Sequence, residues 1–441
     1  MPLLGNPLVK AFSSIPKQTI TGDGTVGPYT LDYPAGSDQD VEVYVNNVRQ
    51  EPGVAYTVAG TAMTMTGAVQ SSDDFYVIFQ GSAQQTVTPA AGSVIDSMIV
   101  DMSSSKLTGA LPAVDGSALT GLAVANRNLI INGAMTVAQR GTSFTSAANA
   151  AYTLDRFVWY DTGAGVVDIS QATDTPNGNF KNSLKIDVTT ADSSLAAGDL
   201  YAIIHNIEGT VSSQLGWGTS DAKNVTVSFW IKSPKTGTHS VAVQNSAQNR
   251  SRSEEFTVSA ADTWEYKSVS FIGDTSGTWL TTNGVGVRIA FPLASGSTFT
   301  QAAGSWGTGN IYASTNQVNC MDDAANNFFI TGIQFEVGDT ATPFEHRSYG
   351  DELAKCQRYF IKNSATAWQF TVTSLGSTFG RSSWDFPTTM RAAPTVSNIT
   401  FNNSNYTASG SQFFTVDGFT VYTNGHTGTV QCTGWEADAE L

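Results

Sequence analysis

Short stretches in which apolar and polar residues alternate are the feature that most constrains how this chain folds. In 225–229, two valines and a phenylalanine alternate with Thr226 and Ser228. An antiparallel strand of a sandwich shows this pattern, with its apolar side chains in the core and its polar ones facing out. Trp230 interrupts the polar face, so we expect something to cover that end of the strand.

The composition favours strands over helices along the whole chain. Only 13% of the 441 residues are charged, and Ser, Thr, Asn and 41 Gly take their place. Such residues suit exposed strands and turns, whereas long surface helices need Glu and Lys. We therefore predict an all-β protein, and a chain of this length needs more than one hydrophobic core.

The N-terminal side of the chain predicts a small β-sandwich over 19–82. Residues 41–46 and 75–80 alternate with period two, and turn residues such as Pro52-Gly53 separate them. The preceding residues 1–18 begin with an apolar, proline-containing stretch that has no clean period. We interpret them either as an arm that docks on another protein or as a disordered segment.

Residues 83–124 change character and predict a shaft. A Leu-Thr-Gly triplet recurs after twelve residues, and three apolar residues upstream follow the a, d, a spacing of a coiled coil. So short a segment cannot bury its apolar residues alone, whereas intertwining with other copies of the chain would bury them. The alternative is a flexible linker. The expected shaft residues are Ile95, Met98, Met102, Leu107, Leu111, Leu119 and Leu122.

Residues 125–349 predict a jelly-roll domain, because candidate strands follow one another with turns between them. We expect eight strands, at 157–160, 184–188, 201–207, 225–230, 238–243, 265–271, 285–290 and 328–337.

Residues 350–441 predict one helix followed by a second β-domain. The helix is expected over 350–361, with two acidic residues in its first turn. Leu353, Cys356, Gln357 and Phe360 would share one of its faces. Strands are expected near 368–373, 395–401, 413–416 and 419–422, and the Asn424-Gly425 pair predicts a tight turn.

The charged and thiol side chains do not predict catalysis or a metal centre. Adjacent acids at 73–74, 254–255 and 322–323 would point to opposite faces of a strand. The four histidines and three cysteines lack metal-ligand spacing, so we expect no cofactor, buried free thiols, and a protein that is not an enzyme. Asp155 and Asp322-Asp323 are candidates for a loop calcium, although solvated loops are the commoner explanation.

The net charge of −15 and the absence of a Lys/Arg cluster argue against a nucleic-acid partner. No apolar run approaches about 18 residues, so no membrane span is expected. The first thirty residues do not have the pattern of a signal peptide, which favours synthesis in the cytoplasm.

Glycan binding is the site hypothesis that remains. Sugars stack on exposed aromatic rings while Asn, Asp or Gln side chains fix the hydroxyls. The C-terminal domain has such residues in loop-like sequence, although most of its rings, Trp435 among them, are expected to be core. The candidate residues are Trp368, Asn405, Tyr406, Asn424 and His426.

A series of short strings gives the chain a family resemblance. Together they resemble the distal part, the jelly-roll domain, the shaft elements and the N-terminal module of bacteriophage tail fibre proteins. The distal strings are "FEVG" (335–338), "ATPFE" (341–345), "YGDEL" (349–353), "CQRYF" (356–360), "MRAAPTV" (390–396) and "ADAEL" (437–441). The jelly-roll strings are "NLIINGAMTVAQRG" (128–141), "YTLDRFVWY" (152–160), "VSFWIK" (227–232) and "ITGIQFEVG" (330–338). The shaft string is "KLTGALPAVDGSALTGL" (106–122), and the N-terminal module has "VEVYVNNVRQEPGVAYTV" (41–58).

The resemblance implies a homotrimeric tail fibre of the virion. Its N-terminal part would attach to tail or adaptor proteins, and its C-terminal part would bind a host surface glycan during adsorption. Two alternatives stay open, a fibre that cleaves the glycan and a structural tail component that contacts only virion proteins. A bacterial surface adhesin is a weaker alternative, because the shaft-like repeat disfavours it.

Overall fold

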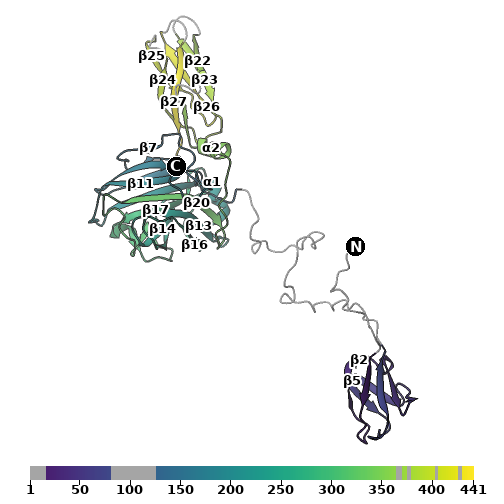
Figure 1. Ribbon diagram of the computed structural model, residues 1–441. Helices are drawn as coiled ribbons and strands as arrows, with labels where there is room; N and C mark the ends of the chain where they lie inside the picture. The colour runs from purple at the N-terminus through teal and green to yellow at the C-terminus, as the bar shows by residue number, and fades with distance from the viewer. Residues whose placement is uncertain (1–15, 81–125, 364–369, 375–378, 403–405, 426–429) are drawn as a thin grey trace. The chain divides into compact units, whose positions relative to one another are not determined.

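The computed structural model describes residues 16–80, 126–363, 370–374, 379–402, 406–425 and 430–441 (Figure 1). The chain divides into two compact units, Met1–Val114 and Asp115–Leu441. The predicted shaft residues Ile95, Met98, Met102, Leu107, Leu111, Leu119 and Leu122 all lie outside the described part, as does most of the predicted arm.

The first unit contains the small β-sandwich that the alternating stretches predict. Val43, Phe75 and Val77 point into a core that also buries Tyr56 and Met63. One sheet has the order β1 (Lys17–Ile20), β6 (Phe75–Phe79), β3 (Val41–Val45) and β4 (Val48–Arg49), and the other pairs β2 (Tyr29–Ala35) with β5 (Tyr56–Met65). A short 3-10 helix, η1 (Asp38–Asp40), precedes β3.

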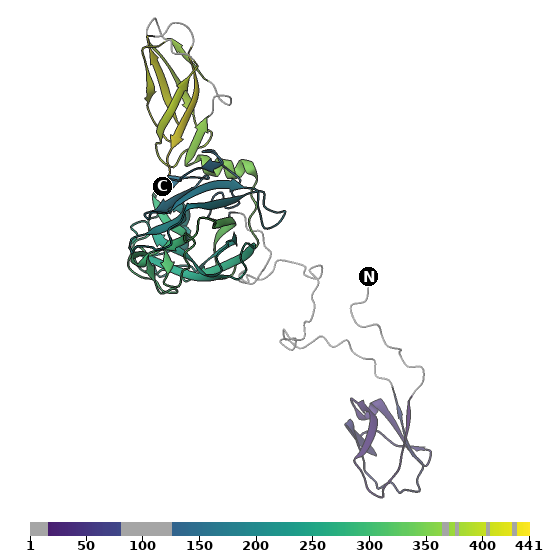
Figure 2. The same cartoon turned by 60° about the vertical axis from the view of Figure 1, so that its left-hand side comes forward.

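The second unit begins with two facing six-stranded sheets, which confirms the all-β fold and its jelly-roll domain (Figure 2). The first sheet has the order β16 (Glu265–Phe271), β13 (Val225–Lys232), β20 (Asn327–Val337), β11 (Ser183–Thr190), β10 (Val166–Ala172) and β7 (Ser143–Phe144). The second has the order β15 (Ser251–Val258), β14 (Gly237–Asn245), β17 (Val285–Ser295), β12 (Leu200–Glu208), β9 (Phe157–Asp161) and β8 (Ala151–Tyr152). All eight predicted strands are present, and β10 and β15 are two longer strands that the sequence did not predict.

The outer face of the first sheet differs from the expectation. Thr226 and Ser228 are 1% and 2% exposed, so the prediction that they face solvent is wrong. Residues 338–345, which follow β20, fold back over this end of the sheet, and Thr226 Oγ1 donates to the main-chain oxygen of Gly338 at 2.7 Å. Trp230, at the other end of β13, is only partly buried.

A long connection covers the outer face of the second sheet. Tyr312 is fully buried there and packs with Val158, Ile204 and Ala290, and Phe299 adds its ring from the same connection. This outer face is therefore closed by the protein's own chain. The short elements of the domain are α1 (Gly209–Ser212), η5 (Ser213–Leu215), η6 (Ser297–Phe299), β18 (Thr300–Gln301) and β19 (Ala313–Ser314).

The predicted helix is shorter than expected. Helix α2 spans Tyr349–Gln357, and Ser348 caps it by accepting a hydrogen bond from the amide of Asp351 at 3.2 Å. Phe360 is not on the helix but opens strand β21 (Phe360–Asn363), because its backbone pairs with Asp438 far along the chain. Leu353 and Cys356 remain on the helix, and Cys356 is buried.

The distal domain is a seven-stranded β-structure built around Trp435, which is 2% exposed, as predicted. The prediction of a strand at 413–416 is wrong: Phe413 has φ = 53° and is 66% exposed. The strand order is β21, β27 (Val430–Asp438), β22 (Phe370–Ser374), β23 (Phe379–Asp385), β26 (Gly418–Asn424) and β25 (Ala408–Gln412), with β24 (Thr395–Phe401) paired to β27.

Candidate functional site

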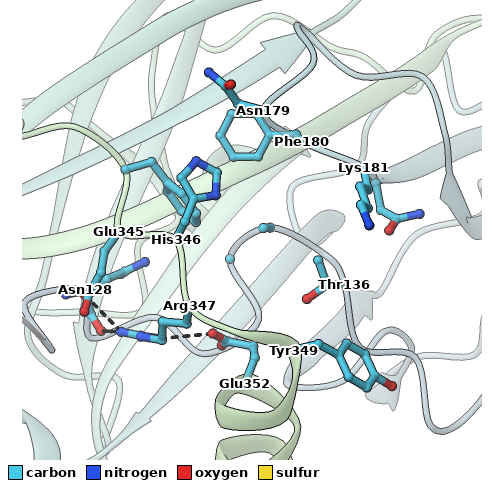
Figure 3. A pocket seen from close by; sticks show the side chains of 14 residues that line it. Asn128, Thr136, Asn179, Phe180, Lys181, Glu345, His346, Arg347, Tyr349 and Glu352 are labelled. Carbon is cyan, nitrogen blue, oxygen red and sulfur yellow. Dashed lines mark hydrogen bonds and ion pairs between the residues drawn. The ribbon is translucent and has the colours of Figure 1, made fainter.

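A cavity of about 290 Å³ opens on the jelly-roll domain where three separate segments meet (Figure 3). One segment is the turn at 133–136, the second is 179–182 just before β11, and the third is 344–349, which leads into α2. Phe180 and Phe344 supply rings, Asn179 supplies an exposed amide, and Tyr349 is 60% exposed at the edge.

The first segment is shaped by the sequence "INGA". Asn132 has φ = 62°, and its side-chain oxygen accepts from the amide of Val137 at 2.9 Å, which holds the turn closed. The next position, 133, requires glycine because any Cβ there would lie 2.1 Å from the main-chain oxygen of Ile333 in β20. The turn therefore packs backbone to backbone against the first sheet.

The ring of Phe180 packs against a second glycine, Gly332. Gly332 interrupts β20 with φ = 63°, and a Cβ there would lie 2.7 Å from the ring of Phe180 and 3.2 Å from that of Trp230. Phe180 contacts the rings of Phe344 and His346 at centroid distances of 5.2 and 5.3 Å. We call Phe180, Phe344 and His346 the aromatic cluster.

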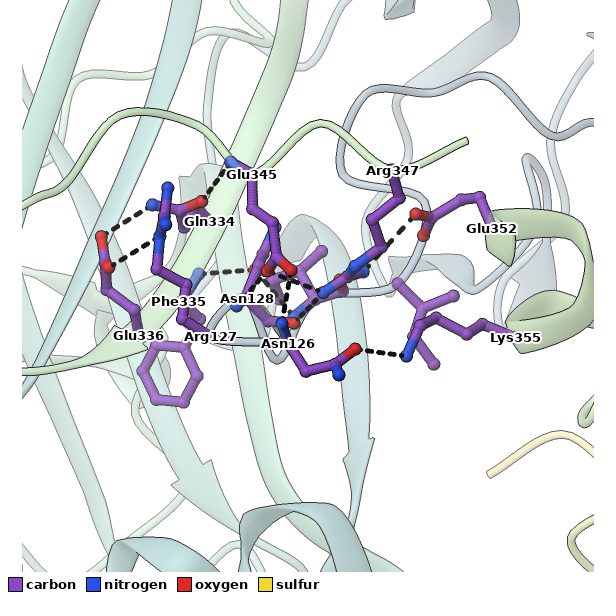
Figure 4. Close-up of polar contacts among 12 residues, drawn as sticks. Asn126, Arg127, Asn128, Gln334, Phe335, Glu336, Glu345, Arg347, Glu352 and Lys355 are labelled. Carbon is purple, nitrogen blue, oxygen red and sulfur yellow. Dashed lines mark hydrogen bonds and ion pairs between the residues drawn. The ribbon is translucent and has the colours of Figure 1, made fainter. Parts of the chain in front are cut away.

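Glu345 and Arg347 fix the third segment to the start of the domain (Figure 4). The carboxylate of Glu345 accepts from the amides of Asn126 and Asn128 at 2.5 and 2.8 Å. Burial alone would raise the pKa of Glu345, but these two hydrogen bonds and the nearby arginines lower it overall. Arg347 donates to the main-chain oxygens of Asn128 and Ile130, the latter at 3.0 Å.

The acids of the cavity are engaged in structure. Glu352 is 8% exposed, accepts from the amide of Asn132 and lies 3.5 Å from Arg347. Glu345 lies 3.3 Å from the same guanidinium. Both carboxylates thus hold the cavity wall in place, while Asn179, Lys181, His346 and Tyr349 are the exposed polar groups around it. This arrangement suits binding of a polar ring-shaped molecule.

The structure describes two of the five predicted site residues. Tyr406 packs edge-on against Phe401 at 5.3 Å and is partly buried, and Asn424 closes β26, where its main-chain oxygen accepts from the amide of Thr407 at 2.8 Å. The two residues therefore lie at the same end of the distal domain. Trp368, Asn405 and His426 lie outside the described residues.

The cavity was missed at the sequence level, although one signal for it was present. "NFKN" at 179–182 places a ring beside amides just before a strand, and a ring beside amides is also what singled out Tyr406. The sequence gives no indication that residues near 133 and 346 meet it.

The carboxylates of Asp155 and Asp322, which were candidates for a loop calcium, are bonded to other residues of the same chain. Asp155 is 1% exposed and accepts from the main-chain and side-chain nitrogens of Gln139, each at 2.6 Å. Asp322 is ion-paired with Lys235 at 2.6 Å. Within the described ranges, no group of three or more His, Cys, Asp or Glu side chains is placed to hold a metal ion. In the same ranges, no helix is long and apolar enough to cross a membrane.

No protein-family model matches the chain, and no curated protein matches its sequence. Among solved structures, it is similar to the enzymatically active domain of tailspike protein 4 of bacteriophage CBA120, with 12% identity and a TM-score of 0.25 over 44% of this chain and 21% of that one. It thus spans about a fifth of that chain's length. It is also similar to the module TmCBM61 bound to β-1,4-galactotriose (12% identity, TM-score 0.24, 48% and 99% covered). A family 11 carbohydrate-binding module from Clostridium thermocellum matches with 12% identity and a TM-score of 0.23, covering 46% and 98%.

Proposed function

We propose that this chain is a bacteriophage tail fibre protein that binds a glycan on the host surface. The observation that carries the binding role is the cavity of the jelly-roll domain, where an aromatic cluster stands beside exposed amide, ammonium and phenol groups. The tail-fibre part of the proposal rests on the family strings, and so does the assembly into a homotrimer that its N-terminal part joins to the virion tail.

The chemistry of the cavity fits a sugar better than an apolar ligand. Its volume of about 290 Å³ lies at the small end of the range for ligand pockets, which suits one or two sugar rings. Ring faces can stack on the apolar side of a pyranose, while Asn179 and Lys181 offer donors to hydroxyl groups. Three copies of a weak site in one fibre would give firm attachment through avidity.

A glycan array of bacterial surface polysaccharides, probed with the labelled full chain, tests this function. We expect binding to a limited set of polysaccharides, and we expect the double variant N179A/Y349A to lose it. Tyr33→Ala, which removes a 55% exposed ring in the first unit, serves as the control that keeps binding. Binding by none of the polysaccharides, or equal binding by the double variant, contradicts the proposal for this cavity.

The predicted distal site is tested on the same array. The variant Y406A/N424A should lose binding if the end of the distal domain holds the glycan instead. Light scattering of the intact protein tests the assembly, with a mass near three times 46.6 kDa expected for the trimer.

A further inference from the structure

Residues 174–182 lie over only part of one end of the outer face of the first sheet: Thr331 is buried there and donates to the main-chain oxygen of Asn182 at 2.7 Å, whereas Trp230 is only partly buried. Residues 338–345 cover Thr226 and Ser228, but the cover stops before Trp230. Trp230 lies directly opposite Tyr266 in the β13–β16 ladder, and their ring centroids are 5.4 Å apart. Tyr266 is 45% exposed.

These two rings lie next to the cavity, whose Phe180 ring is itself only 7% exposed. Phe180, which belongs to the aromatic cluster, and Trp230 both lie against Gly332, within 2.7 and 3.2 Å of where its Cβ would be. Tyr266 then follows on the next strand. We call Phe180, Trp230 and Tyr266 the aromatic strip. It begins in the cavity and leads across β13 to the edge strand β16.

The surroundings of the strip are polar and internally neutralised. Lys232 is ion-paired with Asp174 and lies 4.3 Å from the ring centroid of Phe329, while Trp264 donates to Asp174 at 2.8 Å. Because Lys232 has a carboxylate partner, this face offers rings and hydrogen-bonding groups without an excess of charge. Those are the properties of a surface on which sugar rings stack.

We propose that the aromatic strip extends the cavity into a site for a polysaccharide chain, with sugar units stacking on Trp230 and Tyr266. The inference rests on the proposed glycan-binding function and adds that the bound glycan must be long enough to reach from the cavity to the strip. The occupant is a segment within a long glycan, because the cavity holds one or two rings and the strip provides stacking positions for the units that follow. A ligand confined to the cavity would not use Tyr266.

A size ladder of oligosaccharides separates this inference from the function itself. The ladder is prepared by partial hydrolysis of the polysaccharide that binds best on the array, and each fragment is titrated by calorimetry. We expect affinity to rise with length until the strip is filled. Tyr266→Ala should weaken the longest fragment by a factor of about three to ten and leave the shortest unchanged, since one ring contact contributes about 0.5–1.5 kcal/mol. The N179A/Y349A variant should weaken fragments of every length.

Each of the following outcomes would overturn the inference. Affinity that does not change with length, or a long fragment that Tyr266→Ala binds as the native chain does, overturns the strip and leaves the cavity as the glycan site. An array without any binding polysaccharide overturns both. If Tyr266→Ala instead lowers the mass measured by light scattering, the strip is a contact between copies of the chain, which also overturns the inference. Tyr33→Ala is the control in every titration.

Discussion

The guanidinium of Arg156 and the carboxylate of Glu440 form an ion pair in which the side chains are only 1% and 5% exposed. Arg156 also lies over the ring of Tyr359, 3.6 Å from its centroid. Three separate segments, "YTLDRF" (152–157), "CQRYF" (356–360) and "ADAEL" (437–441), therefore meet at one point, where the jelly-roll domain joins the distal domain. A second ion pair, between Glu208 and Arg358 at 2.7 Å, lies in the same junction.

Removing Glu440 should destabilise this junction strongly. Glu440→Ala leaves Arg156 buried without its counter-ion, and breaking a buried pair in this way typically costs about 3–5 kcal/mol. The free energy of unfolding, measured with urea, should fall by an amount of that order. The matched control is Asp187→Asn, which breaks the more exposed pair with Lys185 and should cost about 0–1 kcal/mol. Equal effects of the two variants would contradict the structural role assigned to Arg156 and Glu440.

Gly332 should not tolerate a side chain. Gly332→Ala puts a methyl group 2.7 Å from the Phe180 ring at a positive φ, and we expect a loss of about 1–3 kcal/mol. Gly178→Ala, two residues from Phe180, meets no atom within 4 Å and should be close to neutral. Thermal unfolding of the two variants makes the comparison, and a neutral Gly332→Ala would show that the cluster is not packed as described.

Two buried histidines should make the protein less stable as the pH falls from about 7 to 5. Burial lowers the pKa of His205 well below its usual range, with a further contribution from Arg156, and burial also lowers the pKa of His239. Below about pH 6.5 the unfolded chain binds protons that the folded protein does not, so each histidine costs up to about 1.4 kcal/mol per pH unit. The double variant H205Q/H239Q should show a flatter dependence of melting temperature on pH. The same slope in both proteins would contradict the assignment.

The three cysteines should be inert in the folded protein. All are buried and free, and burial raises the pKa of Cys320 to about 12 and that of Cys432 to about 11, so almost no thiolate forms at neutral pH. Burial likewise raises the pKa of Cys356. A thiol reagent should label none of them in buffer and all three in denaturant. Rapid labelling of the native protein would mean that one of these sites opens readily.

Local periodicity was enough to predict the fold class and eight strands of the jelly-roll domain, but not β10, β15 or what covers the sheets. Thr226 and Ser228 have the spacing of solvent-facing residues, yet the cover over them comes from residues more than one hundred positions later in the chain. Phe360 has the spacing of a helix residue, yet its backbone pairs with that of Asp438 in the antiparallel β21–β27 ladder. A single sequence does not reveal such distant partners, which is why these positions were assigned wrongly.

The candidate site escaped prediction for the same reason. Its rings and amides come from segments near 133, 180 and 346 that are brought together only by the sheet between them. The predicted distal residues were chosen because they are aromatic or polar side chains in loop-like sequence. Of these, Tyr406 and Asn424 do lie at one end of their domain, and their role in binding stays a prediction.

The pairing of Phe360 with Asp438 means that the chain enters and leaves the distal domain through neighbouring strands. Segments whose ends lie close together can be exchanged with little disturbance to the rest of a protein. Genetic recombination within "CQRYF" and "ADAEL" would thus replace the whole distal domain as a cassette, provided that Arg358 and Glu440 are retained to meet Glu208 and Arg156. A chain with a different distal domain between these two strings would therefore keep the same junction with the jelly-roll domain.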